Sequence, residues 1–218
     1  MLGNRRLKLH KDPEALARAV LGAERTGLDA LVVLGGDGSL QGALALHEAG
    51  LPTVGVPKTI DRDVAATEAT IGFASAVETG CETTERIATS AQSHGLAFLV
   101  EVMGRRSGAL AASVARSAGA DGLLVPECPA GYEELRRRLL SRDADRGCVV
   151  VMAEGFWPEG LAVPDGLDDG HGRMRLGDAS RSLEKLLCAD GADVRSTRLG
   201  HSLRGGRPCA ADRLLAHA

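Results

Sequence analysis

Residues 30–49 read ALVVLGGDGSLQGALALHEA, and the order of residue types in this stretch decides the fold class. The apolar run from Ala30 to Leu34 predicts a buried parallel strand, because strands covered on both faces are almost continuously apolar. Glycines at positions 35, 36 and 38 predict a tight turn, and residues 40–49 repeat apolar side chains at helical spacing. A strand, a glycine turn and a helix form the repeating unit of α/β proteins.

The glycine turn between this strand and helix is a candidate phosphate-binding loop. Free amides at a helix N-terminus attract anions, and glycines let the backbone approach a ligand closely. The candidate residues are Gly36, Asp37, Gly38 and Ser39. The carboxylate of Asp37 can hold Mg²⁺ directly or through water, as a polyphosphate donor requires. The alternative is a glycine-rich turn that binds no ligand.

A second group of polar residues lies in VGVPKTIDRD at positions 54–63. Residues 51–56 predict a buried strand, and Pro57 should end it because proline has no amide hydrogen for the sheet. The polar residues that follow are Lys58, Thr59, Asp61 and Asp63. Open α/β sheets bind ligands at this end of their strands, and an aspartate there can take a proton from a substrate hydroxyl. The alternative is a solvated turn with Asp61 as a helix cap.

Two further predicted strands end in charged residues. The strand at 96–102 runs into Met103, Gly104 and Arg105, and a glycine-flanked arginine can meet phosphoryl oxygens with a rigid set of donors. The strand at 148–153 ends at Glu154. These residues extend the candidate site, although an arginine on a surface turn is the alternative for Arg105.

The last predicted strand, residues 194–199, carries Arg195 and is followed by GHSLRGG. His201 and Arg204 in this loop suit a sugar phosphate, because arginine binds phosphate and an imidazole can hydrogen-bond an oxygen. The alternative is a structural histidine.

Strands and helices alternate along the chain, which predicts a parallel-sheet, doubly wound α/β fold in two lobes. The remaining predicted strand covers 122–125, and the predicted helices cover 13–26, 73–93, 108–118, 132–140 and 180–187. The carboxyl ends of parallel strands share one edge of a sheet. We therefore expect Asp37, the loop 58–63, Arg105, and His201 with Arg204 to converge on one cleft.

Composition excludes several classes of function. The 218 residues are 44% hydrophobic and 25% charged, which is typical of a globular protein with a full core. Only 2% are aromatic and the formal net charge is −3, so neither base stacking nor a basic field favours nucleic acid. No apolar run approaches a membrane span, and MLGNRRLKLHKD lacks a signal-peptide core, so we expect a cytoplasmic location. Five scattered cysteines without a CxxC pair are expected to be reduced.

Several segments together resemble the 6-phosphofructokinase family. They are LGGDGSLQGA, GVPKTIDRD, TIGFASAVET, SH with VEVMGRRSG, GADGLLVPE, VVMAEG and LGHSLRGGRPCAADRLLA. They occur in the family's order and cover most of the chain. The resemblance implies a phosphofructokinase-like fold and phosphoryl transfer from ATP to the 1-hydroxyl of fructose 6-phosphate, a step of glycolysis. It also implies Mg²⁺ and a homo-oligomer whose sites are completed by neighbouring subunits.

The resemblance assigns roles to individual residues. Asp61 would take the proton of the sugar hydroxyl, and Arg105 would stabilise the transferring phosphoryl group. Thr59 and Asp63 would neighbour the acceptor and the metal, and Asp37 would be the carboxylate on the magnesium side. The remaining substrate-binding positions are Met103, Gly104, Glu154, Arg195, His201 and Arg204. The nucleotide-binding positions are Arg6, Gly36, Asp37, Gly38, Ser39 and Lys58.

Two residues bear on the phosphoryl donor. Gly38 leaves room for the α-phosphate of ATP, whereas pyrophosphate-using relatives typically carry an aspartate there. Lys58, in contrast, is the residue that those relatives carry. Because this pair of residues also occurs in ATP-using members, the resemblance favours ATP, with a pyrophosphate-dependent enzyme as the alternative.

The chain also departs from the family's pattern. Arg62 stands in place of the asparagine of TIDND, and Leu96 stands in place of an arginine that reaches the sugar-phosphate site of the neighbouring subunit. Losing such a charge-assisted contact costs about 1.5–3 kcal/mol. These departures keep open a non-catalytic sugar-phosphate-binding or regulatory chain.

Relative to the family, the leading strand, the first nucleotide loop and the closing helices are missing. We expect residues 1–94 to form the donor-side lobe and residues 95–218 the sugar-phosphate-side lobe, with the two lobes interleaved and both incomplete.

Overall fold

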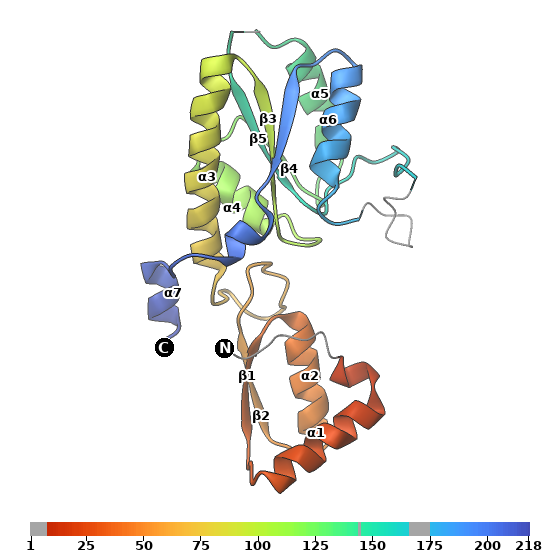
Figure 1. The fold of residues 1–218 in the computed structure, drawn as a ribbon, viewed down its shortest axis with the longest axis vertical. Helices are drawn as coiled ribbons and strands as arrows, with labels where there is room; N and C mark the ends of the chain where they lie inside the picture. The colour runs from red at the N-terminus through yellow and green to blue at the C-terminus, as the bar shows by residue number, and fades with distance from the viewer. Residues whose placement is uncertain (1–7, 144, 166–174) are drawn as a thin grey trace. The chain divides into compact units, whose positions relative to one another are not determined.

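A computed structural model describes residues 8–143, 145–165 and 175–218. Helices and parallel strands alternate along these residues, as predicted. The chain divides into two compact units (Figure 1). The first comprises the residues up to Thr59 together with Asp63–Thr70, and the second comprises Ile60–Arg62 and Ile71–Ala218.

The first unit is built on a two-stranded parallel sheet. β1 (Leu31–Gly35) pairs with β2 (Thr53–Pro57), and Pro57 is the last residue of its strand, as predicted. The other elements of this unit are η1 (Leu9–Lys11), α1 (Pro13–Arg25) and α2 (Asp37–Glu48). Both α-helices lie on the same side of the two strands (Figure 1).

The start of α1 follows from its sequence. The Asp12 carboxylate accepts the amide of Ala15 at 2.9 Å, and Pro13 occupies the first helical position, where a missing amide hydrogen costs nothing. Gly27, at a φ of +67°, lies two residues beyond the end of the helix. A left-handed glycine of this kind is a common helix terminator.

One face of the two-stranded sheet is covered and the other is open. α2 contacts both strands, and Ala23, Leu46 and Leu51 form a small core. On the strands, Val32 is 64% exposed and Val54 is 61% exposed. The prediction that these strands are buried on both faces is therefore wrong for the described residues, because nothing in this unit covers the second face.

The second unit contains a four-stranded parallel sheet in the order β4-β5-β3-β6. Its strands are β3 (Ala97–Val102), β4 (Gly122–Leu124), β5 (Cys148–Ala153) and β6 (Val194–Arg198). Its helices are α3 (Phe73–His94), α4 (Ala109–Ser117), α5 (Gly131–Leu140), α6 (Ala179–Ala189), η2 (Gly200–Arg204) and α7 (Ala210–Leu215). α3 and α4 cover one face and α5 and α6 the other, which confirms the doubly wound arrangement (Figure 1).

Alternate residues of β3 divide the core between these two faces. Leu99 packs with α5 and α6, whereas Val100 packs with α3 and α4. This alternation is expected of a strand with helices on both sides. Glu101 is also fully buried in β3, although the surrounding residues are apolar.

The helices of the second unit receive their N-terminal caps from distant residues. The residues at the N-caps of α3, α4 and α6 make no side-chain cap of their own. Carboxylates from elsewhere in the chain accept the amides instead; those of Asp212 and Glu101 are buried, and that of Glu127 is exposed. The pairs are Gly72 with Asp212 (2.9 Å), Gly108 with Glu127 (2.8 Å) and Ser180 with Glu101 (2.8 Å). Tertiary contacts therefore define where these helices begin.

The compact units divide the chain near residues 60–71, so α3 belongs to the second unit. The predicted lobes divide the chain at residue 94. They are defined by the substrate that each binds and not by compactness, so that division stays a prediction. Residues 156–165 contain no helix or strand, and residues 166–174 lie outside the described residues.

Two expectations from composition can be compared with the structure. All five cysteines are free. None of the helices in the described ranges is both long enough and apolar enough to cross a membrane.

Candidate active site

Asp61 is a buried carboxylate on the loop that follows β2. Its side chain is 6% exposed, and its Oδ2 lies 3.1 Å from the Nε of Arg105, whose side chain is 54% exposed. A carboxylate removed from water is held in its charged form when a cation lies beside it. The structure thus brings together an acid and an arginine that come from different strand ends and lie far apart in the chain.

The loop that carries Arg105 turns sharply after β3. Gly104 has a φ of +139° and Arg105 a φ of +54°, which is unusual for a residue with a side chain. The amide of Ser107 donates to the carbonyl of Gly104 at 3.0 Å and closes the turn. A Cβ at Gly155 would lie 2.1 Å from the carbonyl oxygen of Arg105, so only glycine allows the chain after β5 to approach this loop.

Glu154 holds the same turn from the end of β5. Its Oε1 accepts the amides of Gly104 at 3.2 Å and of Arg105 at 2.9 Å. Burial raises the pKa of Glu154; the two amides oppose this shift, while the neighbouring carboxylates of Glu101 and Asp61 add to it. The predicted contact of Glu154 with a sugar hydroxyl stays a prediction. Its observed contact fixes the backbone of Arg105.

The glycine turn of the first unit connects β1 to α2 as predicted, but the helix begins at Asp37 rather than at residue 40, so Asp37, Gly38 and Ser39 form its first turn. Gly36 is the N-cap of α2 and has no side chain to cap the helix, and the amides of Ser39 and Leu40 donate to its carbonyl at 2.9 and 3.1 Å. A Cβ at Gly35 would lie 2.3 Å from the Cβ of Ser39, so this position requires glycine. A Cβ at Gly38 would meet no atom within 4 Å, which leaves open space beside the turn.

Lys58 and Thr59 lie beside this turn. The amide of Lys58 donates to the carbonyl of Gly35 at 2.8 Å, and a Cβ at Gly36 would lie 3.3 Å from the Cβ of Thr59. Asp37 accepts the side-chain amide of Gln41 at 2.8 Å. Across the described ranges, no group of three His, Cys, Asp or Glu side chains could hold a metal ion. A single carboxylate such as Asp37 nevertheless fits Mg²⁺, which usually takes one or two carboxylates together with phosphate oxygens and water.

His201 and Arg204 lie on η2, which follows β6. Because β6 is the parallel neighbour of β3, η2 starts at the same sheet edge as the Arg105 loop, and the amide of Leu199 donates to the carbonyl of Glu101 at 2.9 Å. Leu203 is buried and anchors η2, while His201 and Arg204 are exposed. The second unit therefore contains Asp61 together with Arg105 and the η2 residues, and the last two follow its own strands β3 and β6.

Arg195 is not at that edge. It lies opposite Phe98 near the start of β6, and β6 continues to Arg198. Three strand residues span about 10 Å. Its guanidinium lies 3.2 Å from the Asp193 carboxylate and donates to the carbonyl of Val194. The structure thus separates Arg195 from Asp61 along the length of the strand.

The remaining predicted residues are distributed as follows. Met103 is 9% exposed in the core beside β3, with Gly104 next to it. The first unit contains Asp37, Lys58, Thr59 and Asp63, whereas Asp61 belongs to the second. Convergence of the two groups on one cleft stays a prediction, and Arg6 lies outside the described residues.

The residues that support the Asp61 loop were not predicted from the sequence. The guanidinium of Arg62 lies over the ring of Phe73, 5.2 Å from its centroid, and Asp212 caps the helix that begins at Phe73. One signal was available. A long helical pattern preceded by Gly72, with no acidic residue in its first turn, lacks a local cap.

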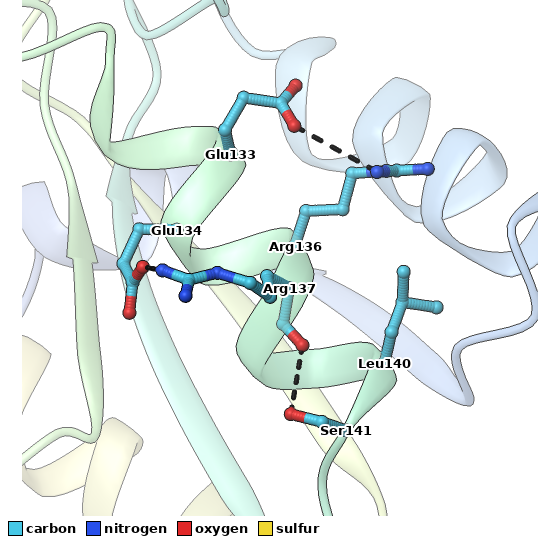
Figure 2. A pocket seen from close by; sticks show the side chains of 6 residues that line it. All are labelled: Glu133, Glu134, Arg136, Arg137, Leu140 and Ser141. Carbon is cyan, nitrogen blue, oxygen red and sulfur yellow. Dashed lines mark hydrogen bonds and ion pairs between the residues drawn. The ribbon is translucent and has the colours of Figure 1, made fainter.

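A separate hollow of about 500 Å³ lies on α5 and is lined by charged side chains (Figure 2). Arg136 lies 3.9 Å from Glu133, Arg137 pairs with Glu134, and the hydroxyl of Ser141 donates to the carbonyl of Arg137 at 3.0 Å. A run of arginines on a helix predicts a solvated face, and these surface pairs agree with that interpretation. None of the predicted site residues lines the hollow.

Two curated relatives similar to this chain have names that refer to the phosphorylation of fructose 6-phosphate. A sequence model of the family described as "Phosphofructokinase" matches residues 1–218. The chain is 38% identical over 219 residues to the ATP-dependent 6-phosphofructokinase of Chloroflexus aggregans. The aligned region covers 98% of this chain and 60% of that protein. It is 40% identical over 225 residues to the pyrophosphate–fructose 6-phosphate 1-phosphotransferase of Amycolatopsis methanolica. That aligned region covers 99% of this chain and 64% of that protein.

A solved structure agrees with these sequence matches. The phosphofructokinase from Saccharomyces cerevisiae superposes with a TM-score of 0.77 at 31% identity, over 98% of this chain and 30% of that chain. The chain thus spans 60% and 64% of the lengths of the two curated relatives named above.

Proposed function

The chain belongs to the phosphofructokinase family, and we propose that it transfers the terminal phosphoryl group of ATP to the 1-hydroxyl of fructose 6-phosphate. The observation that carries this proposal is the ion pair between buried Asp61 and Arg105. It puts a base for the hydroxyl proton next to a cation for the phosphoryl oxygens, which are the two groups that such a transfer needs. A role in glycolysis and a cytoplasmic location are part of the proposal.

Asp61 acts as the general base. As the sugar oxygen forms its bond to phosphorus and the bond to the leaving ADP oxygen breaks, the hydroxyl proton passes to the Asp61 carboxylate. The burial of Asp61 supports this role, because a carboxylate that is shielded from bulk water can accept its proton from a bound substrate hydroxyl instead of from solvent. The carboxylate is aimed by its neighbour Arg105 rather than left to rotate.

Arg105 stabilises the charge on the transferring group. Its side chain is 54% exposed, which keeps the guanidinium accessible to a substrate, while its backbone is fixed by Glu154. A fixed cation costs little reorganisation when charge develops in the transition state. The exposed His201 and Arg204 on η2 bind the sugar phosphate.

The glycine turn of the first unit binds the donor phosphates. Its glycines allow close approach of the backbone, and the amides at the start of α2 have no side-chain cap from Gly36. Asp37 would hold Mg²⁺, which usually takes one or two carboxylates together with phosphate oxygens and water. When bound, the metal neutralises charge on the donor phosphates. Lys58 adds a positive charge beside the same turn.

The open space beside Gly38 supports ATP as the donor. A nucleotide needs room for its α-phosphate, and a Cβ at position 38 would meet no atom within 4 Å. Relatives with both donors exist, since the Chloroflexus protein is named for ATP and the Amycolatopsis protein for pyrophosphate. Pyrophosphate is therefore the alternative donor, and Lys58 is the residue that favours it.

We propose that the protein works as a homo-oligomer. Arg195 lies near the start of β6, about 10 Å of strand away from the edge that carries Arg105. If Arg195 binds a sugar phosphate, that phosphate belongs to the site of another subunit. This proposal explains why a family substrate-binding position lies so far from Asp61.

A second candidate is a non-catalytic chain that binds sugar phosphates. Leu96 supports it, because an arginine at this position would supply a phosphate contact that leucine cannot make. This candidate predicts that fructose 6-phosphate raises the melting temperature of the protein while no product forms with either donor.

A coupled assay for fructose 1,6-bisphosphate separates the candidates. The purified chain is incubated with Mg²⁺, fructose 6-phosphate and either ATP or pyrophosphate. ATP-dependent product that Asp61→Asn abolishes is the expected result. No product with either donor, from protein shown to be folded by circular dichroism, would refute catalysis by this chain.

A further inference from the structure

The C-terminal helix α7 is held to the second unit by a charged residue. The one buried residue of α7 in the described structure is Asp212, at 3% exposed. The apolar residues of α7 are largely outside, with Leu214 73% and Leu215 36% exposed. Apolar burial therefore contributes little to the attachment of α7, and the Asp212 carboxylate is its main contact.

That carboxylate binds the first turn of α3, beside which α7 lies (Figure 1). Its Oδ1 accepts the amide of Gly72 at 2.9 Å, and its Oδ2 accepts the amide of Ser75 at 2.8 Å and also the Ser75 hydroxyl. The amide of Cys209, just before α7, donates to the same hydroxyl oxygen at 3.0 Å. Bonds to an ionised carboxylate are stronger than bonds between neutral groups.

α3 has no acidic group of its own at its N-terminus. Its N-cap is Gly72, at a φ of +104°, and its first turn contains no acidic residue. Burial alone raises the pKa of Asp212, but the bonds from Ser75 and Gly72 outweigh it, so that the pKa lies below its ordinary value. Asp212 is therefore an anion at the positive end of a 22-residue helix, where a negative charge is stabilising.

The first turn of α3 in turn supports the loop that carries Asp61. Phe73, the first residue of α3, lies under the guanidinium of Arg62, 5.2 Å from ring centroid to Cζ. Phe73 and Ile60 pack against the same core cluster, and a Cβ at Gly72 would lie 3.6 Å from Ile60. Asp61 lies between Ile60 and Arg62, so one of its chain neighbours stacks on the first residue of this helix and the other packs against the same core cluster.

The Asp61 loop requires such support because its backbone is strained. Arg62 has a φ of +53°, and a left-handed conformation is costly for a residue with a Cβ. A stacked guanidinium and ring offset part of that cost. The loop conformation therefore depends on where Phe73 sits, and Asp212 fixes the turn that contains Phe73.

We propose that Asp212 is a positioning residue for Asp61. It fixes the first turn of α3, this turn fixes Ile60 and Arg62 through Phe73, and the Asp61 carboxylate is thereby held 3.1 Å from Arg105. The effect on turnover rests on the proposed function, whereas the effect on the loop does not. The competing explanation is that Asp212 only attaches α7 to the protein.

Asp212→Asn tests the proposal in the full chain, because asparagine keeps the shape and removes the charge. Amide hydrogen exchange is followed by mass spectrometry in residues 60–76 and in residues 209–216. We expect exchange in both segments to be about tenfold faster, the size of effect that loss of a cap produces. The matched control is Arg213→Gln on the same helix, since the Nε of Arg213 donates to the carbonyl of Pro208, just before α7, at 2.8 Å.

The variant Phe73→Leu separates positioning from attachment. It removes the ring under Arg62 and leaves the bonds between Asp212 and α3 in place. Faster exchange at residues 60–62 with unchanged exchange in α7 shows that the Phe73 ring supports the loop independently of the attachment of α7, and faster exchange at residues 60–62 in Asp212→Asn then shows that Asp212 acts through this ring. Unchanged exchange at residues 60–62 in both variants would overturn the proposal.

Steady-state kinetics supply a second readout. We expect Asp212→Asn to lower kcat about tenfold and to leave KM for fructose 6-phosphate within about twofold, because the sugar-phosphate residues lie on η2. Asp212→Glu should recover part of kcat, since it restores the anion. Should the unmodified chain show no turnover with either donor, the proposed function fails, while the exchange experiment still tests the role of Asp212.

Discussion

The Oε1 of Glu154 lies 2.9 Å from the amide nitrogen of Arg105, so a buried acid at the end of β5 fixes the backbone of the arginine that faces Asp61. The arginine side chain is half-exposed, but its main chain is not free to move. The guanidinium of Arg105 can therefore adjust to a substrate while the turn that carries it stays fixed. Such preorganisation is what electrostatic stabilisation of a transition state requires.

Substitution of Glu154 by glutamine should change the pH dependence of stability. Because burial raises the pKa of Glu154 above its ordinary 4.5, the native protein binds more protons than the unfolded chain between that value and the raised one. The unmodified protein should therefore lose stability as the pH rises through this window. Glu154→Gln lacks this titration and should not show the loss. Urea unfolding from pH 4 to pH 8 measures it, and parallel curves for the two proteins would contradict the assignment.

Substitution of Glu101 should destabilise the second unit. This side chain is fully buried and accepts the amide of Ser180 at the start of α6. Glu101→Ala leaves that amide without its acceptor and opens a cavity, so the free energy of unfolding should fall by about 3 kcal/mol. Glu101→Gln keeps an acceptor and should lose less than half as much. Equal losses in the two variants, measured by denaturant unfolding, would show that the hydrogen bond is not the cause.

Substitution of Gly38 should change the preference for the phosphoryl donor. The space beside this residue is open, so an aspartate fits without a clash, but its charge lies where a nucleotide phosphate would bind. Gly38→Asp should lower kcat/KM for ATP by about 100-fold, which corresponds to the removal of two charge-assisted hydrogen bonds to the nucleotide. Turnover with pyrophosphate should fall much less. An equal decrease with both donors would argue against a role of Gly38 in donor choice.

Substitution of Asp212 should remove part of the acid sensitivity of the fold. Since its pKa lies below the ordinary 3.8, the native protein binds fewer protons here than the unfolded chain does. The stabilisation is present above pH 3.8 and is lost as the pH falls through the lowered value. Asp212→Asn should be less stable than the unmodified protein at pH 6, and the difference should shrink towards pH 2. A difference that is independent of pH would show that charge is not involved.

The parallel α/β architecture could be predicted from the sequence because its signals are local. Pro57 ends β2 where its missing amide hydrogen requires, and Asp12 with Pro13 starts α1. Gly35 and Gly36 mark the turn between β1 and α2. In each case the residues that determine the structure lie within a few positions of the structure that they determine.

The supports of the site could not be predicted because they act over long distances in the chain. Glu101 lies within an apolar strand, and its partner Ser180 is 79 residues away. Asp212 lies 140 residues from Gly72. The sequence around Asp212 does not indicate which distant helix its carboxylate caps. The position of Arg195 likewise depends on how far along β6 it lies, which the loop sequence after the strand does not reveal.

The central claim is that Asp61 is the base that accepts the proton of the sugar hydroxyl. Steady-state turnover of Asp61→Asn with ATP, Mg²⁺ and fructose 6-phosphate tests it most directly, with Asp190→Asn as the control for loss of a surface acid paired with Arg136. We expect Asp61→Asn to lower kcat by about 10²–10⁴-fold while the control retains full activity. If Asp61→Asn keeps kcat within about threefold of the unmodified chain, another group is the base.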